Sequence, residues 1–308
     1  MAAFSTTGTL VYASAGATAG RLVAVSRFGS ETVISDMSRT YASPQLSPDD
    51  RRVVVVVSET NALWTQDTTR QVFTRLTPPE TNTGWPIWTP DGQRVVYRSV
   101  SGIRWVQTDG SGRGGVISGT TQQDTPTSVS PDGGTLLFHR ISPEGGGDVY
   151  VLSLRGDSKP RPIVKTTAYE GGPKFSPDGR WIAYASNESG QFQIYVRPFP
   201  GPDRKVQVST DGGSYPLWNK KGGELFYRNG NKMMAVEIRT GSPDADPVMS
   251  APKLLFDQRY EFVGNTIASY DVSADGQRFV FVRQETTANR LNVVLNWFDE
   301  LKARVPTK

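Results

Sequence analysis

Carboxylate, amide and aromatic side chains recur in the connections that lead into successive short apolar segments of the chain. Carboxylate and amide oxygens suit Ca²⁺, and a calcium ion held by them can polarise a substrate oxygen as a Lewis acid. Aromatic rings beside polar groups favour the binding of a small ligand or a protein segment. The residues in these connections are Tyr41, Glu80, Asn82, Trp85, Gln123, Asp124, Tyr169, Glu170, Asp211, Tyr215 and Arg259.

His139 is the single histidine of the chain and follows Phe138 in an apolar segment. A lone histidine beside an aromatic residue is more often packed and hydrogen-bonded than a general base, and no nucleophile motif lies near it. The chain has no cysteine, so disulfides, thiolate zinc sites and a thiol nucleophile are excluded, as is any site with several histidines. His139 therefore stays a catalytic candidate behind the carboxylates.

A four-residue signature, Ser-Pro-Asp-Gly, marks the elements that would position these side chains. Pro before Asp presets the backbone for a turn, and Asp-Gly supplies a tight turn between two apolar segments. Clear copies lie at 47–50, 89–92, 130–133 and 176–179, degenerate copies at 219–222 and 273–276, and the weakest at 5–8. The copies recur about every 42 residues, a period typical of repeated supersecondary units.

Each copy of the signature lies in the same context of four short segments. One apolar segment ends at the turn, a second follows it, and a third, alternating segment precedes a more polar fourth. Four-stranded antiparallel units that pack on one another around an axis are β-propeller blades. The sequence therefore predicts an all-β propeller whose second strands lie at 52–57, 94–98, 135–139, 180–185, 224–228 and 278–282.

The seven copies predict seven blades in a single domain over 1–308, with six and eight blades as the alternatives. The last unit runs from a third strand at 291–297 into a short helix at 297–302, with no fourth strand after it. One blade would then be a strand short, and its unpaired edge would offer a route to self-association. The missing strand could also have preceded Met1 in a longer parent chain.

The aspartates of the signature could be read as cation ligands, but the repeat argues for a structural role. One aspartate per blade lies far from the next, and a short carboxylate that caps its own loop is common turn chemistry. We therefore expect turn-forming roles for Asp49, Asp91, Asp132, Asp178 and Asp275.

Composition narrows the classes of function. The 31 Gly and 21 Pro residues exclude a helical bundle, because each costs about 1–3 kcal/mol inside a helix. The net charge of +4 includes no basic run, so nucleic acid is not an expected partner. The longest apolar run, at 53–57, is too short to span a membrane, and the first residues do not form a signal peptide.

The signature copies, with 182–186 and 194–196 after one of them, resemble TolB-type propellers over the whole chain. The stretches 176–200 and 293–302 are similar to a bacterial group in which such propellers follow a serine/threonine kinase domain. This resemblance implies a protein-binding or ligand-sensing module on the extracytoplasmic, periplasmic side, cut from a longer parent. Kinase activity is not implied, because the Gly-rich loop, His-Arg-Asp and Asp-Phe-Gly motifs are missing.

The leading hypothesis is a binding module that takes a protein segment or small molecule where the innermost strands begin at the axis. Its ligand-binding residues would be Tyr41, Trp85, Tyr215 and Arg259. The alternative is a hydrolase of esters, lactones or phosphotriesters that holds calcium in the channel, as some propellers resembling lactonases do. Its metal ligands would be Glu80, Asn82, Asp124, Glu170 and Asp211; its catalytic candidates are Glu80, Asp124, Glu170, Asp211 and His139. A regulatory appendage with no activity of its own is the third interpretation.

Overall fold

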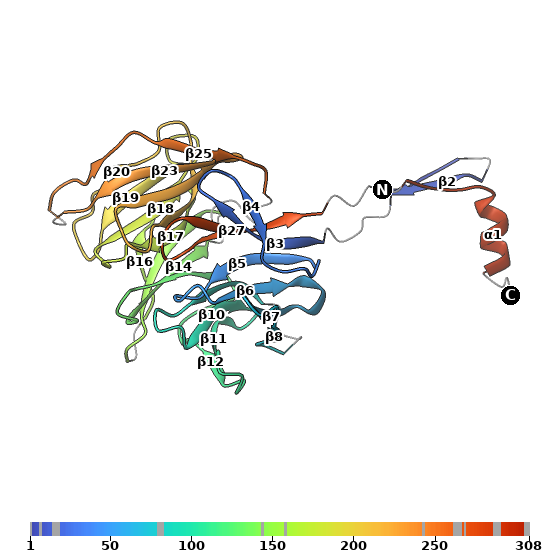
Figure 1. The fold of residues 1–308 in the computed structure, drawn as a ribbon, viewed down its shortest axis with the longest axis horizontal. Coiled ribbons are helices and arrows are strands. Elements are labelled where there is room, and N and C mark those ends of the chain that lie inside the picture. The colour runs from blue at the N-terminus through green and yellow to red at the C-terminus, as the bar shows by residue number, and fades with distance from the viewer. Residues whose placement is uncertain are drawn as a thin grey trace.

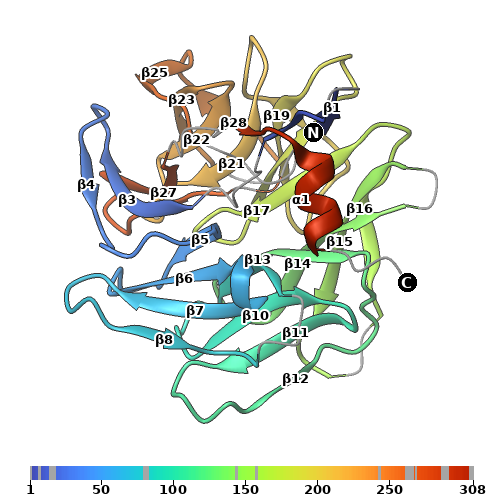
Figure 2. The same ribbon diagram turned by 90° about the vertical axis from the view of Figure 1, so that its right-hand side faces the viewer.

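The computed structural model describes residues 2–5, 8–13, 19–78, 83–142, 145–156, 159–241, 244–260, 267, 269–285 and 291–304. In six places, a copy of the signature separates the first and second strands of an antiparallel sheet. Six such sheets stand around a common axis, and Figure 2 shows them radiating from it. The fold is therefore a six-bladed β-propeller.

The first three blades follow one another along the chain, each starting with its innermost strand. Blade 1 contains β5 (Tyr41–Leu46), β6 (Arg52–Val57), β7 (Ala62–Asp67) and β8 (Phe73–Arg75), with a 3-10 turn, η1 (Ser58–Thr60), between β6 and β7. Blade 2 contains β9 (Gly84–Trp88), β10 (Arg94–Ser99), β11 (Gly102–Gln107) and β12 (Gly114–Val116). Blade 3 contains β13 (Asp124–Val129), β14 (Thr135–Ile141), β15 (Gly147–Ser153) and β16 (Arg161–Val164).

Blades 4 and 5 repeat this order, and blade 5 carries an additional strand. Blade 4 contains β17 (Glu170–Phe175), β18 (Trp181–Ser186), β19 (Gln193–Pro198) and β20 (Val206–Gln207). Blade 5 contains β21 (Ser214–Trp218), β22 (Glu224–Asn229), β23 (Lys232–Arg239), β24 (Val248–Met249) and β25 (Lys253–Asp257), with both β24 and β25 paired to β23.

Blade 6 closes the ring with strands from both ends of the chain. Its inner strands are β26 (Asp271–Val272) and β27 (Arg278–Gln284), and its outer strands are β3 (Gly20–Ser26) and β4 (Glu31–Val33). β27 pairs with β3 over seven consecutive positions, from Arg278 opposite Ser26 to Gln284 opposite Gly20. The strand that seemed missing from the sequence is therefore supplied by the N-terminal part of the same chain.

The expected seven blades are thus wrong, and six is the correct number. The weakest copy of the signature, at 5–8, lies between β1 (Ala2–Phe4) and β2 (Leu10–Ala13), outside the propeller. Segment 291–297 does not complete a blade either, because β28 (Leu291–Val294) pairs with β2 in a separate three-stranded sheet. No blade in the described part is a strand short, so the expected route to self-association loses its basis.

The three-stranded sheet is followed by α1 (Trp297–Arg304), and Figure 1 shows both apart from the blades. The propeller itself, over the residues described, contains no α-helix. In the propeller, the chain ends nearest to the small sheet are the end of β27 and the beginning of β3, which pair with each other. Because β27 runs away from the signature turn of its blade, the end of β27 and the beginning of β3 lie on the axial face where the innermost strands begin.

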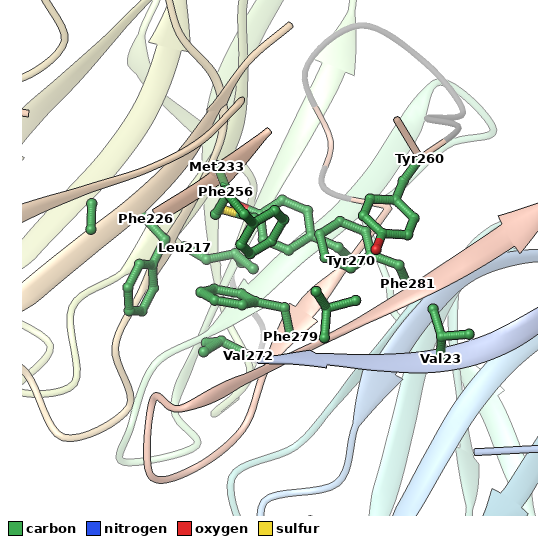
Figure 3. Close-up of a cluster of buried hydrophobic side chains, with 12 residues drawn as sticks. Val23, Leu217, Phe226, Met233, Phe256, Tyr260, Tyr270, Val272, Phe279 and Phe281 are labelled. Carbon is green, nitrogen blue, oxygen red and sulfur yellow. The ribbon is translucent and has the colours of Figure 1, made fainter. Parts of the chain in front are cut away.

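Apolar side chains between adjacent blades form the core, and the cluster between blades 5 and 6 is the most aromatic (Figure 3). Phe226 of β22 meets Phe279 of β27 edge-to-face, with ring centroids 5.1 Å apart. Tyr270 stacks on Phe281 at 5.2 Å. Each buried aromatic side chain contributes on the order of 2 kcal/mol, so the closing blade is fixed firmly against its neighbour.

The innermost strands of five blades contain a bulge, because their pairing register to the second strand shifts midway. Four of the bulges place a residue with positive φ directly before a proline: Ser43 (50°), Trp85 (44°), Gly172 (61°) and Tyr215 (59°). A bulge re-aims the side chains that follow it. The two halves of each inner strand therefore present different residues to the axis.

Candidate functional site in the axial channel

The signature aspartates form turns, as the repeat indicated. In each turn, the first residue's hydroxyl donates a hydrogen bond to the aspartate; for example, Ser47 Oγ lies 2.6 Å from Asp49 Oδ1. The same carboxylate oxygen accepts a backbone N–H two residues later. The bond from Thr89 lowers the pKa of Asp91, and the bond from Ser130 does the same for Asp132. These carboxylates are committed to their own loops.

A cavity of about 480 Å³ lies on the axis at the ends of the innermost strands, beside the signature turns. Two rings of equivalent residues line this axial channel, one residue of each ring coming from each blade. The deep ring lies two residues before each signature and consists of Gln45, Ile87, Ser128, Lys174, Leu217 and Asp271. The mouth ring is the second signature position and consists of Pro48, Pro90, Pro131, Pro177, Lys220 and Ala274.

Lys174 is the cation of the deep ring. Its Nζ donates a hydrogen bond of 2.6 Å to the carbonyl oxygen of Thr127 on the neighbouring blade. Removal from bulk water lowers the pKa of Lys174 to about 8, against a smaller opposing effect of the Asp271 charge. The part of this side chain that stays accessible lies along the channel. Lys174 therefore places a weakly partnered ammonium group inside the cavity.

A second charged group lies at the seam where blades 5, 6 and 1 meet. Lys220 Nζ is 3.7 Å from Asp271 Oδ2 and 3.9 Å from Asp50 Oδ1. Asp50 Oδ2 accepts the backbone N–H of Ala274 at 2.8 Å. Asp271 Oδ2 accepts the N–H of Leu46 at 2.9 Å, so one network joins three blades. Burial raises the pKa of Asp50, with the Lys220 charge acting in the opposite direction.

The apolar wall of the channel is held rigidly. Trp88 Nε1 donates to the carbonyl oxygen of Gln45 at 3.1 Å, and Trp218 Nε1 donates to that of Lys174 at the same distance. Both bonds cross from one blade to the next. Phe175 lies on the same wall, and its backbone N–H donates to Ser128 Oγ at 3.2 Å. The channel can thus enclose an apolar body between fixed aromatic rings and offer it a cation.

The carboxylates expected to act lie at the opposite end of the innermost strands. Asp124 is fully buried and accepts two hydrogen bonds from Arg140, at 2.6 and 2.8 Å. Glu170 is also buried and accepts a bond from Thr166 Oγ1 at 2.5 Å; burial raises its pKa. These two side chains serve the packing of blades 3 and 4, and neither lines the axial channel.

His139 lies at the same end of the blades as Asp124 and Glu170, and it is a packed core residue. It is 1% exposed, and its ring lies 5.1 Å from the ring of Tyr169. Burial, helped by the charge of Arg98, lowers the pKa of His139 to about 4, so the imidazole is neutral at pH 7. A Cβ on Gly147 would lie 2.3 Å from His139 Nε2, which shows how closely the backbone covers the ring.

Trp85 and Tyr215 occupy equivalent positions, the left-handed residue before the bulge proline. The guanidinium carbon of Arg98 lies over the Trp85 ring, 5.2 Å from the ring centroid. Trp85 lines a separate pocket of about 300 Å³. Tyr215 packs against the cluster between blades 5 and 6, and its carbonyl oxygen accepts the Tyr270 hydroxyl at 2.8 Å. Their side chains do not line the axial channel.

The remaining expected residues are dispersed. Tyr41 belongs to blade 1 and is buried in the core between blades 6 and 1, and its hydroxyl donates to the carbonyl oxygen of Met37. Asp211 and Arg259 are exposed. Glu80 and Asn82 lie outside the described residues. Within the described part of the chain, no three His, Asp or Glu side chains group closely enough to hold a metal ion.

The charged residues of the channel had a signal in the sequence that the search for acidic connections missed. Several signature copies depart from Ser-Pro-Asp-Gly, and the departing residues include Asp50, Lys220 and Ala274, which form the seam network. Asp50 even keeps the left-handed backbone (φ 59°) that the other copies give to glycine. Lys174 and Asp271 are likewise the only charged residues at their position in the six described copies.

Comparison with known proteins agrees with this architecture. The family described as "TolB beta propeller domain" matches residues 101–250. The uncharacterized protein Atu1656 of Agrobacterium fabrum (strain C58 / ATCC 33970) is 27% identical over 161 residues, which are 50% of this chain and 53% of that protein. The chain thus spans about half the length of this curated relative.

Solved structures show the same fold. A TolB candidate from Agrobacterium tumefaciens superposes with a TM-score of 0.67 at 17% identity, covering 88% of this chain and all of that one. TolB from Acinetobacter baumannii gives 0.59 at 19% identity, covering 83% of this chain and 61% of that one. An oligogalacturonate lyase in complex with manganese gives 0.54 at 12% identity, covering 96% and 81%. At these identities the likeness concerns the fold alone.

The described part of the chain was also compared with the requirements of a membrane span. None of its helices combines the length and the apolar character needed to cross a bilayer.

Proposed function

We propose that this chain, whose residues 101–250 match the TolB beta propeller domain, is a binding module whose site is the axial channel beside the signature turns. The ligand is a small molecule or the end of a protein segment. A cavity of about 480 Å³ falls within the range of roughly 300–1,000 Å³ typical of small-molecule sites. It is too small for a folded domain, which could insert only a terminus or a narrow loop.

The observation that carries this proposal is the contrast between a fixed apolar wall and a few polar groups inside one cavity. Trp88 and Trp218 are held by hydrogen bonds between blades, so little side-chain freedom is lost when a ligand packs on them. Lys174 and the seam network supply the polar groups that orient a ligand. The propeller acts as a rigid scaffold for this arrangement.

The proposal can be tested by filling the mouth of the channel. Ala274→Trp and Pro131→Trp each place a large ring at the mouth, on different blades. Ala251→Trp is the matched control, because Ala251 is exposed and does not line the channel. Binding of three probes, phenylacetate, phenylacetamide and phenethylamine, would be measured by saturation-transfer NMR and calorimetry.

We expect at least one probe to bind the wild-type protein and the Ala251→Trp variant, and to lose most of its affinity for both mouth variants. Circular dichroism and the melting temperature would show that the variants are folded. Binding that survives in both mouth variants, or the failure of all three probes to bind the wild-type protein at millimolar concentration, would refute the channel as the site.

A further inference from the structure

We propose that the ligand of the axial channel carries a carboxylate, and that Lys174 is the residue that holds it. This inference rests on the proposed function and specifies the chemical class of its ligand. The carboxylate belongs either to a small organic acid with an apolar body or to the C-terminus of a peptide chain, and the experiment below separates these two sources.

Hydrogen-bond capacity is the first argument. A lysine ammonium group has three N–H donors, and the Thr127 carbonyl oxygen accepts one of them. Over the residues that the structure describes, Lys174 has no carboxylate within salt-bridge distance. A cation removed from bulk water with a single neutral acceptor is costly, so a ligand anion that completes its hydrogen bonds is strongly favoured.

The acidic groups near the channel are the second argument, because each already has its own partners. Asp271 Oδ1 accepts the backbone N–H of Val272 at 2.8 Å, and its Oδ2 accepts that of Leu46. Lys220 lies between Asp271 and Asp50 and offsets part of their negative charge. Asp50 Oδ2 accepts the N–H of Ala274, and its Oδ1 faces Lys220 without a hydrogen bond. The seam aspartates are thus held beside Lys220, whereas Lys174 has no carboxylate partner among the described residues.

The surroundings of Lys174 define the rest of the ligand. Phe175 follows Lys174 in the chain, and Trp218 contacts Lys174 across the interface between blades 4 and 5. Leu217 is the next residue of the deep ring. Prolines fill four of the six mouth positions and offer no hydrogen-bond donor. A carboxylate on a flat or branched apolar body fits these apolar walls, because its body packs on them while its charged end reaches Lys174.

The protonation state of Lys174 gives the proposal a pH signature. The charged groups that face it are Asp271 from blade 6 and Lys220 from blade 5, with Asp50 of blade 1 behind Lys220. With a pKa of about 8, Lys174 is mostly protonated at pH 7 and loses its charge as the pH rises. Affinity for a carboxylate should therefore decline above about pH 8, whereas affinity for a neutral amide should not change.

The decisive experiment compares phenylacetate with phenylacetamide on four proteins: the wild type, Lys174→Met, Lys174→Gln and Lys221→Met. Lys221→Met is the matched control, because Lys221 is exposed and is not part of the channel wall. We expect phenylacetate to bind the wild type and the control at least tenfold more tightly than the amide. Both Lys174 variants should lose that preference and keep the amide affinity.

Two additional measurements test where the carboxylate comes from and how its binding depends on pH. Acetyl-Gly-Phe with a free C-terminus is compared with its amidated form and with phenylacetate; a tenfold advantage of the free peptide over phenylacetate assigns the site to a chain terminus. Equal affinity or better for phenylacetate assigns it to small acids. Phenylacetate binding is measured at pH 7 and pH 9.5, and the expected result is a decline of at least fivefold.

Three results would overturn the assignment: an acid that binds no better than its amide, a preference that survives in both Lys174 variants, or an acid affinity that is equal at the two pH values. If the amide binds and the mouth variants block it, the channel remains a binding site and only the carboxylate assignment fails. If neither compound binds the wild type, both proposals fail.

Discussion

The two ends of the innermost strands use charge in opposite ways. At the end where these strands begin, Asp124 is paired with Arg140, and the guanidinium of Arg98 covers Trp85. Arg98, Arg140 and the buried Arg228 occupy equivalent positions, each opposite the first residue of its inner strand. At the end where the strands finish, Lys174 faces a cavity with one neutral acceptor.

This comparison shows why an acidic or aromatic residue near the axis is a poor guide to function. Asp124 is fully engaged by Arg140 and by the backbone N–H of Thr121, so it stabilises the propeller and has little capacity left for a ligand. The channel residues include a cation that the fold does not complete. Variants at the two ends should therefore differ in kind: stability should change at the first, and binding at the second.

The largest effect is expected for Asp124→Ala. This substitution removes the fully buried carboxylate that pairs with the Arg140 guanidinium, so the Arg140 charge is left without its partner. We expect the free energy of unfolding to fall by about 3 kcal/mol. Lys174→Met, by contrast, should leave the protein at least as stable, because it removes a desolvated charge. Urea denaturation followed by tryptophan fluorescence measures both.

The double variant Asp124→Ala, Arg140→Met is the control for this pair. It removes both charges, so it should recover a substantial part of the stability that the single variant loses. If Lys174→Met were as destabilising as Asp124→Ala, the contrast between the two ends would be wrong.

A smaller effect is expected from acid, through His139. Its folded-state pKa of about 4 is below the unfolded value, so the unfolded state binds a proton first and stability falls as the pH drops from about 6.5 towards 4. Between pH 7 and pH 5 this contribution amounts to about 2 kcal/mol. His139→Leu should reduce the decline by that amount, as unfolding curves at the two pH values would show; parallel declines would contradict it.

The smallest change in stability is expected for Asp50→Gly, at the seam. Glycine relieves the left-handed backbone at φ 59° but loses the hydrogen bond to Ala274, so the two effects of about 1 kcal/mol should nearly cancel. The loss of a negative charge beside Lys220 should raise phenylacetate affinity about threefold. Asp50→Asn keeps the side chain, removes the charge and should give the same gain; unchanged affinity in both variants would separate the seam from ligand binding.

Much of the fold was predictable because its signals are local. The hydroxyl, carboxylate and backbone groups of each signature bond within five residues, so the turn chemistry of Asp91 or Asp132 is visible in a short stretch of sequence. The strands beside the turns were predicted with nearly their observed bounds. The blade number was not, because the copy at 5–8 and the strand at 291–294 resemble blade segments locally. The strand after that copy, β2, instead pairs with β1 and with the strand at 291–294 outside the propeller.

The candidate site was less predictable, since its residues are far apart in sequence. Asp124, Glu170 and His139 were identified by chemical type. The structure shows that Arg140 occupies both oxygens of Asp124 and that Thr166 bonds one oxygen of Glu170. Lys174 and Lys220 were not recognised, although both break the repeat. Aligning the copies and asking which one carries a charge would have singled them out.

The sequence by itself determined the repeated turn, the four-stranded unit and the all-β architecture, because these depend on contacts between residues close along the chain. Only the tertiary structure decided that the ring closes after six blades, through the pairing of β27 with β3, and which end of the inner strands encloses a cavity. The bond between Leu46 and Asp271 joins residues 225 positions apart. Such a contact depends on the cumulative rotation of all the blades between them, which no local pattern encodes.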